Sequence, residues 1–311
     1  MKFLFLMDPL ETVHMEKDTT FTFMLEAHKR GHEVYYLPED GITLQQGHLH
    51  FHAVKVKPQV AAHQPFIEER LVNLTDEQIH AVFVRVDPPF DQQYLMNTWL
   101  LEFLPKHIPV INGPLGVRTV NEKVWAAQFT NLVPPTVISS NQNKLLEFIT
   151  QQQDVIAKPT NGHGGKSVFR IGPSDTNTKV ILEQLTNNWS TPIVLQRYVH
   201  EAKNGDKRIL LLNGEPLGTI LRVHTRGDHR NNLFAGGKAQ PAQMTKRDQE
   251  IIATLKPYLL ELGLYFVGID IIGDYLIEVN VTSPTCLQEM NQFYNQHLEE
   301  KVIDFVENLI K

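Results

Sequence analysis

The stretch from Gly268 to Asn280, G-I-D-I-I-G-D-Y-L-I-E-V-N, sets the tightest limits on the fold of this chain. Its two apolar runs are separated by glycine and aspartate, a pattern that predicts two antiparallel strands joined by a short turn. If residues 273–275 form a three-residue turn, Asp270 lies directly opposite Glu278. Asn280, two residues further on, then falls on the same face. The hairpin therefore gathers three oxygen-bearing side chains on one side.

Those three side chains would be costly to bury unpaired, because their neighbours in the hairpin are almost all apolar. Carboxylate and amide oxygens are ligands that Mg²⁺ accepts, and in nucleotide-dependent enzymes substrate phosphates complete its coordination. The pattern thus predicts a magnesium site made by Asp270, Glu278 and Asn280. The alternative is that all three face solvent, for which the hairpin offers little polar surface.

A second candidate is the glycine-rich stretch Asn161 to Ser167, N-G-H-G-G-K-S. Its glycines allow backbone amides to approach phosphate oxygens closely. It is not a Walker A loop, because Thr160 stands where that motif requires glycine and the following Val168 to Ile171 has the character of a strand. Taken alone, the stretch is more typical of a tight hairpin between two strands.

Cations flank this stretch and strengthen the phosphate interpretation. Lys158 ends the preceding strand and Lys123 lies earlier, on a predicted helix, so the two could neutralise a triphosphate from one side. Arg208, Arg222 and Arg230 follow on a predicted hairpin and its loop, and a guanidinium suits carboxylate or phosphate oxygens. Each of these lysines is, by itself, more commonly a solvated charge, and each arginine more commonly part of a structural ion pair.

The order of predicted elements indicates an α/β and α+β fold in three parts. Residues 1–120 alternate strands and helices as a parallel α/β unit does, but lack the G-x-G-x-x-G of a nicotinamide site. Residues 121–200 form a small α+β lobe that contains the glycine-rich stretch. Residues 201–311 begin with a hairpin turning at Asn213-Gly214 and continue with a polar loop from His224 to Gln240, which we interpret as a lid.

Composition excludes several classes of protein. In 311 residues, 35 acidic against 29 basic side chains give a net charge of -6, which argues against a nucleic-acid partner. No apolar run is long enough to cross a bilayer, and the N-terminal one ends at Asp8, so we expect no membrane association and no signal peptide. The single cysteine, Cys286, fits a reducing compartment and hence the cytoplasm.

Two other features are given the plainer interpretation. His48, His50 and His52 share one face of a strand and could bind a transition metal, but a solvated edge strand explains them as well or better. Cys286 could be a nucleophile, yet no histidine and aspartate partners can be identified, so we predict a packed thiol.

The chain resembles the prokaryotic glutathione synthetases in a series of short motifs from the first strand to about Met290. These are M-D-P near the start, D-P-P-F-D at 87–91, N-E-K at 121–123, K-P at 158–159, the glycine-rich stretch, G-D-K-R at 205–208, N-L-F-A-G-G at 232–237, V-G-I-D-I-I-G-D at 267–274 and E-V-N-V-T-S-P-T at 278–285. The segment from Val267 to Thr285 is the most specific part of the match.

The resemblance implies an ATP-grasp fold with an N-terminal parallel α/β domain, and ATP held between the central and C-terminal lobes. It implies phosphate binding by Lys123, Lys158, Gly162, Gly164 and Gly165, and an adenine slot at residues 196–199, with Gln196, Tyr198 and Val199 as contacts. Magnesium, or manganese in its place, would be held by Asp270, Glu278 and Asn280. Catalytic roles fall to Arg208 and Arg230, and substrate binding to Arg85, Arg222, Arg230, Ser283 and Pro284.

The reaction implied by the resemblance is ligation of γ-glutamylcysteine to glycine through an acyl phosphate, with ATP converted to ADP and phosphate, in a homotetramer or homodimer. Three positions depart from the pattern of the family: Val86 replaces a lysine, His163 a methionine and Arg197 a small polar residue. They leave open a ligase for another acceptor or dipeptide, and a regulator that binds nucleotide without turnover. The acceptor and any feedback control are not readable from the sequence.

Overall fold

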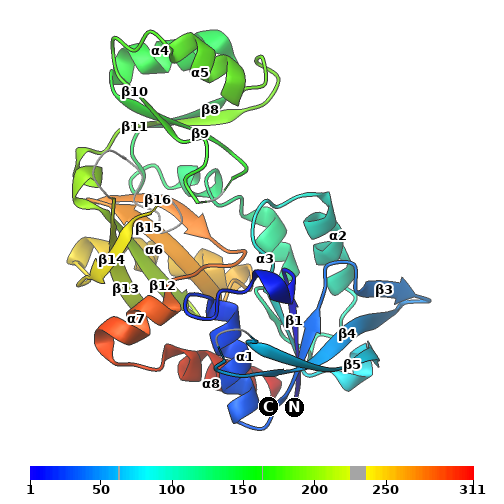
Figure 1. Cartoon of the computed structure of the whole chain (residues 1–311). Coiled ribbons are helices and arrows are strands. Elements are labelled where there is room, and N and C mark those ends of the chain that lie inside the picture. Colours follow the sequence, from blue (N-terminus) through cyan, green and yellow to red (C-terminus); the bar gives the residue numbers. More distant parts are fainter. Residues whose placement is uncertain (62–63, 163, 225–235) are drawn as a thin grey trace.

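The computed structural model describes residues 1–61, 64–162, 164–224 and 236–311, arranged around three β-sheets (Figure 1). The four-stranded sheet lies at one end of the molecule in a lobe of its own. The seven-stranded and five-stranded sheets lie beside each other below it, and the two chain termini are close together at the opposite end (Figure 1). The prediction of a mixed α/β and α+β fold is therefore correct.

The N-terminal sheet is mixed rather than wholly parallel. Its strands β1 (Lys2–Met7), β2 (Glu33–Leu37), β6 (Ala81–Arg85) and β7 (Val110–Ile111) are parallel, as predicted. The order is β3-β4-β2-β1-β6-β7, with β5 also paired to β4, and these additional strands are antiparallel. They are β3 (Ile42–Gln45), β4 (His48–Pro58) and β5 (Phe66–Thr75).

The helices of this part begin where the sequence places their caps. Asp18 precedes α1 (Thr19–Lys29), and its carboxylate accepts a hydrogen bond of 2.7 Å from the backbone N–H of Phe21, which satisfies one of the free amides of the first turn. Asp91 does the same for the N–H of Tyr94 at the start of α2 (Gln92–Leu101). The next helix is α3 (Pro114–Thr119).

The prediction that the three histidines lie on an edge strand is wrong. Strand β4 is not at an edge, because it pairs in antiparallel orientation with β2, β3 and β5. The face that carries the histidines is nevertheless open, with His48 and His52 exposed. Among the described residues there is no group of three or more His, Cys, Asp and Glu side chains that could hold a metal ion.

The lobe at the end of the molecule contains an antiparallel sheet in the order β10-β9-β11-β8. Two helices, α4 and α5, cover one face of it (Figure 1). The helix predicted to hold Lys123 and Trp125 is only a 3-10 turn, Trp125–Gln128, so Lys123 lies just before it. The elements are β8 (Thr136–Ser139), α4 (Gln142–Gln152), β9 (Val155–Pro159), β10 (Phe169–Ile171), α5 (Thr178–Leu185) and β11 (Ile193–Arg197).

The third sheet is antiparallel in the order β14-β13-β12-β15-β16. Its first hairpin, β12 (Asp206–Leu212) and β13 (Glu215–Val223), turns at Asn213 and Gly214, whose φ values of 53° and 73° are those of the predicted tight turn. Part of the predicted loop from His224 to Gln240 is instead strand β14 (Lys238–Pro241), paired with β13, while residues 225–235 lie outside the described part. The later helices are α6 (Lys246–Glu261), α7 (Leu287–Tyr294) and α8 (Leu298–Ile310).

The last hairpin consists of β15 (Phe266–Ile272) and β16 (Tyr275–Asn280), and it differs from its prediction in the turn. Ile272 pairs with Tyr275, so the turn has two residues rather than three. A bulge beside Asp270 then shifts the register by one residue, which restores Asp270 opposite Glu278 as predicted. Asn280 lies opposite Gly268.

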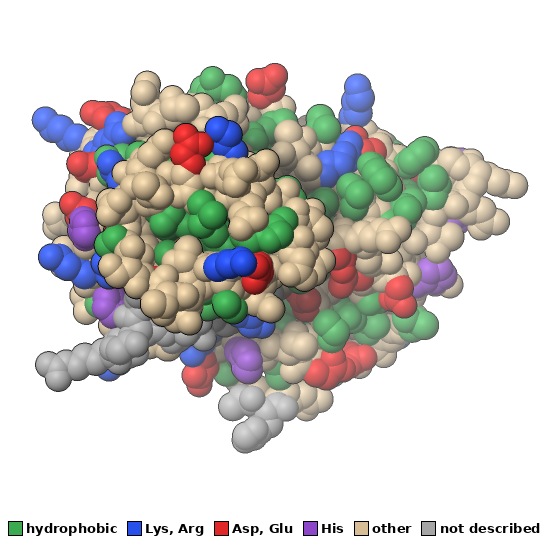
Figure 2. Space-filling model, turned by 90° about the horizontal axis from the view of Figure 1, so that it is seen from above, with side chains coloured by type: hydrophobic (Ala, Val, Ile, Leu, Met, Phe, Trp, Pro, Cys, Tyr) green, Lys and Arg blue, Asp and Glu red, His purple; other side chains and the backbone are tan. Residues whose placement is uncertain are grey.

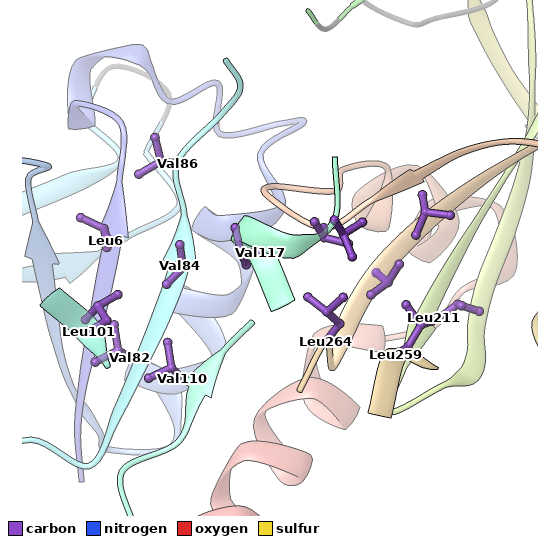
Figure 3. Close-up of a cluster of buried hydrophobic side chains, with 14 of the residues drawn as sticks. Leu6, Val82, Val84, Val86, Leu101, Val110, Val117, Leu211, Leu259 and Leu264 are labelled. Carbon is purple, nitrogen blue, oxygen red and sulfur yellow. The ribbon is translucent and has the colours of Figure 1, made fainter. Parts of the chain in front are cut away.

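Two buried hydrophobic clusters join the first and third sheets, and one of them contains Phe3, Phe83 and Phe266. Leu6, Val84 and Val110 from the N-terminal sheet belong to the same buried cluster as Leu211 and Leu264 from the C-terminal part. Figure 3 shows Val117 of α3 lying between the two groups of side chains. The four-stranded lobe has a separate core, made by Leu145, Ile149, Val155, Ala157, Ile171, Leu182, Ile193 and Leu195. The first and third sheets are thus one packed unit, and the lobe packs independently.

The surface seen from above the four-stranded lobe carries charges of both signs. In Figure 2 lysine and arginine side chains are interspersed with aspartate and glutamate over this face, instead of forming one basic patch. No helix in the described ranges has the length and apolar character required to span a membrane.

Candidate active site

A cavity of about 120 Å³ opens between the four-stranded lobe and the last hairpin. All eight residues predicted to contact the nucleotide line it, and so do two of the three predicted metal ligands, Asp270 and Glu278. The eight come from the linker before the lobe, from β9, from the loop between β9 and β10, and from the end of β11 with the two residues that follow Arg197. They are Lys123, Lys158, Gly162, Gly164, Gly165, Gln196, Tyr198 and Val199.

Two buried lysines converge on Glu278 inside this cavity. The Nζ atoms of Lys158 and Lys123 lie 3.3 and 3.9 Å from its Oε1. Burial lowers the pKa of Lys158, with Glu278 opposing the effect. Burial raises the pKa of Glu278, but the two lysines outweigh it and hold that pKa below its usual range. The carboxylate therefore stays charged, and the lysines remain available to a further anion.

Lys123 also fixes the glycine-rich loop. Its Nζ donates a hydrogen bond of 2.5 Å to the backbone oxygen of Gly162. Gly164 and Gly165 have φ values of 64° and 75°, a conformation that favours glycine, so this part of the loop depends on their lacking a Cβ. The loop thus presents backbone amides beside two ammonium groups, an arrangement suited to phosphate oxygens.

Asp270 lies in a buried network of two carboxylates and two guanidinium groups. Arg208 donates to both of its oxygens, over 2.5 and 2.9 Å, and Arg222 approaches one of them at 2.9 Å. Arg222 also pairs with Asp206 through two hydrogen bonds of 2.7 and 2.8 Å. Burial raises the pKa of Asp270, but the two arginines hold it well below its usual range.

The three predicted metal ligands fit a divalent cation by donor type and by position. Asp270 and Glu278 are paired across the hairpin, and Asn280 follows on the same strand, its amide donating to Gly268 O at 3.3 Å. A carboxylate has about four acceptor positions, and the arginines use three of those of Asp270. Two carboxylates and an amide leave coordination positions for phosphate and water, as Mg²⁺ sites in nucleotide enzymes do.

Two further cavities continue from the first toward the N-terminal sheet. The nearer one shares Lys123, Gly162, Gly164 and Glu278 with the nucleotide cavity, and adds Arg208, Arg222, Asn280 and Pro284. The farther one encloses about 820 Å³ and is bounded by Arg85, by residues 12–20 and by the segment after β16. The near and far cavities share Asp87, Ser283 and Thr285. The three cavities therefore follow one another from the glycine-rich loop to the N-terminal sheet, each sharing wall residues with the next.

Arg85 is buried at the wall of the far cavity without an ion pair to any described carboxylate. Its side chain is only 4% exposed, and it donates to Thr20 Oγ1 at 3.0 Å and to the backbone oxygen of Pro284 at 2.9 Å. The first turn of α1 lines the same cavity. A guanidinium beside a helix N-terminus favours a carboxylate ligand. The backbone oxygen of Pro284 therefore makes the contact with Arg85.

The end of β11 differs in detail from a simple adenine slot. The side chain of Gln196 donates to Thr136 Oγ1 at 3.0 Å, and Arg197 donates to the hydroxyl of Tyr275 at 3.0 Å. The guanidinium of Arg170 lies 3.9 Å from the ring centroid of Tyr198. Arg197, one of the three departures from the family pattern, therefore braces the lobe against the last hairpin.

The other two departures and the remaining predicted residues have different locations. Val86 packs in the core shared by the first and third sheets (Figure 3). His163 and Arg230 lie outside the described residues. Cys286 is buried, as predicted, and burial raises the pKa of its thiol.

Glu122 is a site residue that sequence reasoning did not single out, although it belongs to the N-E-K motif. Its Oε1 accepts hydrogen bonds from Val281 N, Thr282 N and Thr282 Oγ1, over 3.0, 3.2 and 2.8 Å. Its backbone oxygen accepts from Val279 N. It therefore ties the linker that carries Lys123 to the segment that follows the metal ligands. Asp87, of the D-P-P-F-D motif, is a second such residue.

Comparison with known families agrees with this geometry. Residues 1–118 match the model of the N-terminal domain of prokaryotic glutathione synthetase, and residues 122–295 match that of its ATP-grasp domain. Glutathione synthetases from Vibrio cholerae, Synechocystis sp. and Ralstonia nicotianae are similar at 38%, 39% and 40% identity. The alignments cover 98–99% of this chain and 95–99% of the relatives.

Solved structures with the same fold include more distant ligases. D-cycloserine synthetase DcsG superposes with a TM-score of 0.67 at 16% identity, over 99% of each chain. The ATP-grasp ligase PsnB, complexed with a minimal precursor, gives 0.65 at 14% identity, over 99% of this chain and 98% of that one. At such identities the likeness concerns the fold alone.

Proposed function

Because the chain belongs to the prokaryotic glutathione synthetase family and is an ATP-dependent ligase that forms glutathione, we propose that its three connected cavities divide the reaction between them. The cavity at the four-stranded lobe takes ATP, the near cavity holds the reacting groups, and the far cavity takes γ-glutamylcysteine. The observation that carries this assignment is the set of residues shared by adjacent cavities, with Lys123 and Glu278 at one junction and Ser283 at the other.

In the nucleotide cavity Lys123, Lys158 and the amides of the glycine-rich loop neutralise and hold the phosphates. The adenine lies at residues 196–199, enclosed by apolar side chains such as Ile156 and Ile277. Phosphoryl transfer depends mainly on positioning and on stabilising negative charge, so fixed cations beside the γ-phosphate are the principal contribution of this cavity.

Asp270, Glu278 and Asn280 would hold Mg²⁺, or Mn²⁺ in its place. When bound, the cation would neutralise charge on the phosphate oxygens during transfer. The carboxylates of this chain contribute by remaining ionised in a buried place, which the arginines and lysines around them ensure. The same groups keep Asp270 and Glu278 in fixed orientations.

In the near cavity Arg208 and Arg222 receive the anionic groups that react. An oxygen of the cysteinyl carboxylate attacks the γ-phosphorus and forms an oxygen–phosphorus bond, giving an acyl phosphate, while the bond from that phosphorus to ADP breaks. The amine of glycine then attacks the acyl carbon, and phosphate leaves with the bonding electron pair. Both arginines are buried, so their charge acts in a medium where it is poorly screened.

In the far cavity Arg85 binds a carboxylate of γ-glutamylcysteine, and Ser283 lies at the exit toward the reacting groups. A dipeptide held at Arg85 by one carboxylate has its other carboxylate free to reach the near cavity. Arg230 completes the substrate site in this proposal, as the family pattern implies.

A phosphate-release assay tests the function directly. With ATP, Mg²⁺ and γ-glutamylcysteine, we expect sustained phosphate release that requires glycine, accompanied by glutathione detected by mass spectrometry. Other small amines added in place of glycine serve as controls. Turnover with another amine but not with glycine would contradict glycine as the acceptor. Absence of turnover under every condition would contradict the assignment of the protein as an ATP-dependent ligase.

Two wider features belong to the same proposal. We place the protein in the cytoplasm, since its one cysteine is buried and forms no disulfide, as is usual in a reducing compartment. We also propose a homodimer or homotetramer, consistent with the exposed apolar side chains of Met96 and Trp99 on α2 and of Phe103 just after it. Sedimentation of the purified protein at several concentrations would reveal a monomer if this is wrong.

A further inference from the structure

Asp87 occupies the junction between the near cavity and the far cavity. It lines both, together with Ser283 and Thr285. It follows Arg85, which lies at the wall of the far cavity, and it precedes the start of α2. A side chain at this position can reach a molecule in either cavity, and any group that passes from the far cavity to the reacting centre passes beside it.

The carboxylate of Asp87 forms no ion pair with a cationic side chain among the residues that the structure describes. Ser283 lines the same two cavities and lowers the pKa of Asp87, and the backbone N–H of Asp87 donates to Asp8 Oδ2 at 2.8 Å. Although Asp87 interacts electrostatically with Arg85, no cation lies within ion-pairing distance of it among the described residues. It thus differs from Asp270 and Asp206, whose oxygens are engaged by arginines. Such a carboxylate is free to accept a proton.

The ligation needs a proton acceptor at this place. Glycine in neutral solution carries an ammonium group, which has no lone pair and cannot attack an acyl phosphate. The lysines and arginines around the near cavity cannot remove its proton, because they are themselves cationic. Glu278 and Asp270 are held ionised by cations, which makes them poor bases.

The geometry points to Asp87 as the general base that deprotonates the acceptor amine, an inference that rests on the proposed function. Asp87 takes one proton from the ammonium group and becomes a neutral carboxylic acid, and the freed lone pair forms the carbon–nitrogen bond. The acyl carbon–oxygen bond breaks as phosphate leaves with its electrons. The second proton of the amine passes to phosphate or water.

The charge surroundings of Asp87 suit this role. Burial and the nearby charge of Asp8 raise its pKa to about 6, while Ser283 and Arg85 act in the opposite direction. A base with a pKa near neutrality is ionised at physiological pH and still binds a proton well enough to assist transfer. The titratable groups that face it from the neighbouring elements are Asp8 after β1, Asp18 before α1, Arg85 on β6 and Tyr94 on α2. The walls of the two cavities add further groups: His14, Glu16, Lys17 and Glu289 in the far cavity, and Glu122, Lys123, Arg208, Arg222, Glu278 and Cys286 in the near cavity.

Asp87→Asn separates the two half-reactions. We expect glutathione formation to fall by about 100-fold or more, the usual contribution of a general base. Acyl phosphate formation should continue, and it can be trapped with hydroxylamine, a nucleophile that is already neutral at pH 7 and needs no base. The variant should therefore form hydroxamate at close to the wild-type rate. In the wild type, glutathione formation should rise with pH around 6 and then level off. In the variant it should instead keep rising with pH, because only glycine that has already lost its proton to water can attack.

Asp91→Asn is the matched control, because it changes an aspartate in the same D-P-P-F-D motif. Asn caps a helix about as well as Asp, so α2 and glutathione formation should be unaffected. Asp87→Glu should restore part of the activity. If Asp87→Asn forms glutathione at the wild-type rate, or loses hydroxamate formation equally, Asp87 is not the base. Absence of glutathione formation in the wild type would instead overturn the proposed function.

Discussion

At the scale of single residues, Glu278 connects three parts of the site through one carboxylate. It receives Lys123 from the linker and Lys158 from the four-stranded lobe, and it lies opposite Asp270 on the last hairpin. Because the lysines lower its pKa, its negative charge is present throughout the neutral range. In the proposed mechanism it would align the cation and the phosphate, a role that depends on charge more than on shape.

Replacing that charge should affect turnover far more than nucleotide binding. In Glu278→Gln the size and one acceptor oxygen remain, while the electrostatic contribution to phosphoryl transfer is lost. We expect kcat to fall by about 100-fold, comparable with removal of one strong electrostatic group from an active site. ATP affinity, measured by calorimetry, should change little because both lysines and the glycine-rich loop are kept. Glu250→Gln, on an exposed part of α6, is the control, and an unchanged kcat in Glu278→Gln would remove Glu278 from the mechanism.

At the scale of secondary-structure elements, α6 is a helix whose start is secured by its own sequence. Thr245 accepts a hydrogen bond from Asp248 N, and the side chain of Asp248 accepts one from Thr245 N. Asp248 is fully buried and also pairs with Lys207 on β12. The cap therefore orients the helix against the sheet that carries Arg208.

Removing the cap should cost stability without reaching the active site. Thr245→Ala should lower the free energy of unfolding by about 1 kcal/mol, the usual value of an N-cap side chain. Thr245→Ser keeps the hydroxyl and should stay close to the wild type. Urea denaturation followed by circular dichroism would measure both, and equal stabilities of the two variants would show that the hydroxyl does not contribute.

At the scale of the whole molecule, the N-terminal and C-terminal parts are held together by a shared core and by one buried amide. Asn112, 2% exposed at the end of β7, donates to the backbone oxygens of Phe266 and Val281 and accepts from Phe266 N, each over 2.7 Å. Figure 1 shows that these two sheets lie side by side, while the four-stranded lobe extends away from them. The far cavity is formed where the two joined parts meet.

Breaking this connection should weaken the molecule globally. Asn112→Ala leaves buried backbone groups without partners, and each such group costs about 1–3 kcal/mol. We expect unfolding to begin at a clearly lower temperature and KM for γ-glutamylcysteine to rise, because the cavity for that substrate spans both parts. Asn308→Ala, on the exposed face of α8 in the C-terminal part, is a control for loss of an amide. Wild-type values of both the melting temperature and KM in Asn112→Ala would contradict this.

The sequence by itself determined the local elements and the chemical groups of the site. Asp18, Asn213-Gly214 and the alternation around Asp270 act within a few residues, so their structures follow from hydrogen bonding and side-chain periodicity along the chain. The eight residues predicted to contact the nucleotide line one cavity, and most of them could be grouped from the sequence because they lie in short motifs on or after strands β9 and β11. The turn of the last hairpin is one residue shorter than predicted. Asp270 nevertheless lies opposite Glu278, as predicted, because a bulge beside Asp270 shifts the register by one residue.

Only the tertiary structure decided how distant segments meet. The two arginines on Asp270, the anchoring of residues 281–282 by Glu122, and the position of Asp87 between two cavities all depend on the packing of one sheet against another. Such contacts join residues more than 40 positions apart, where no periodicity of the sequence extends. The core between the first and third sheets also depends on tertiary packing. The hydrophobic effect favours burial of its apolar side chains, but it does not select which other surface covers them.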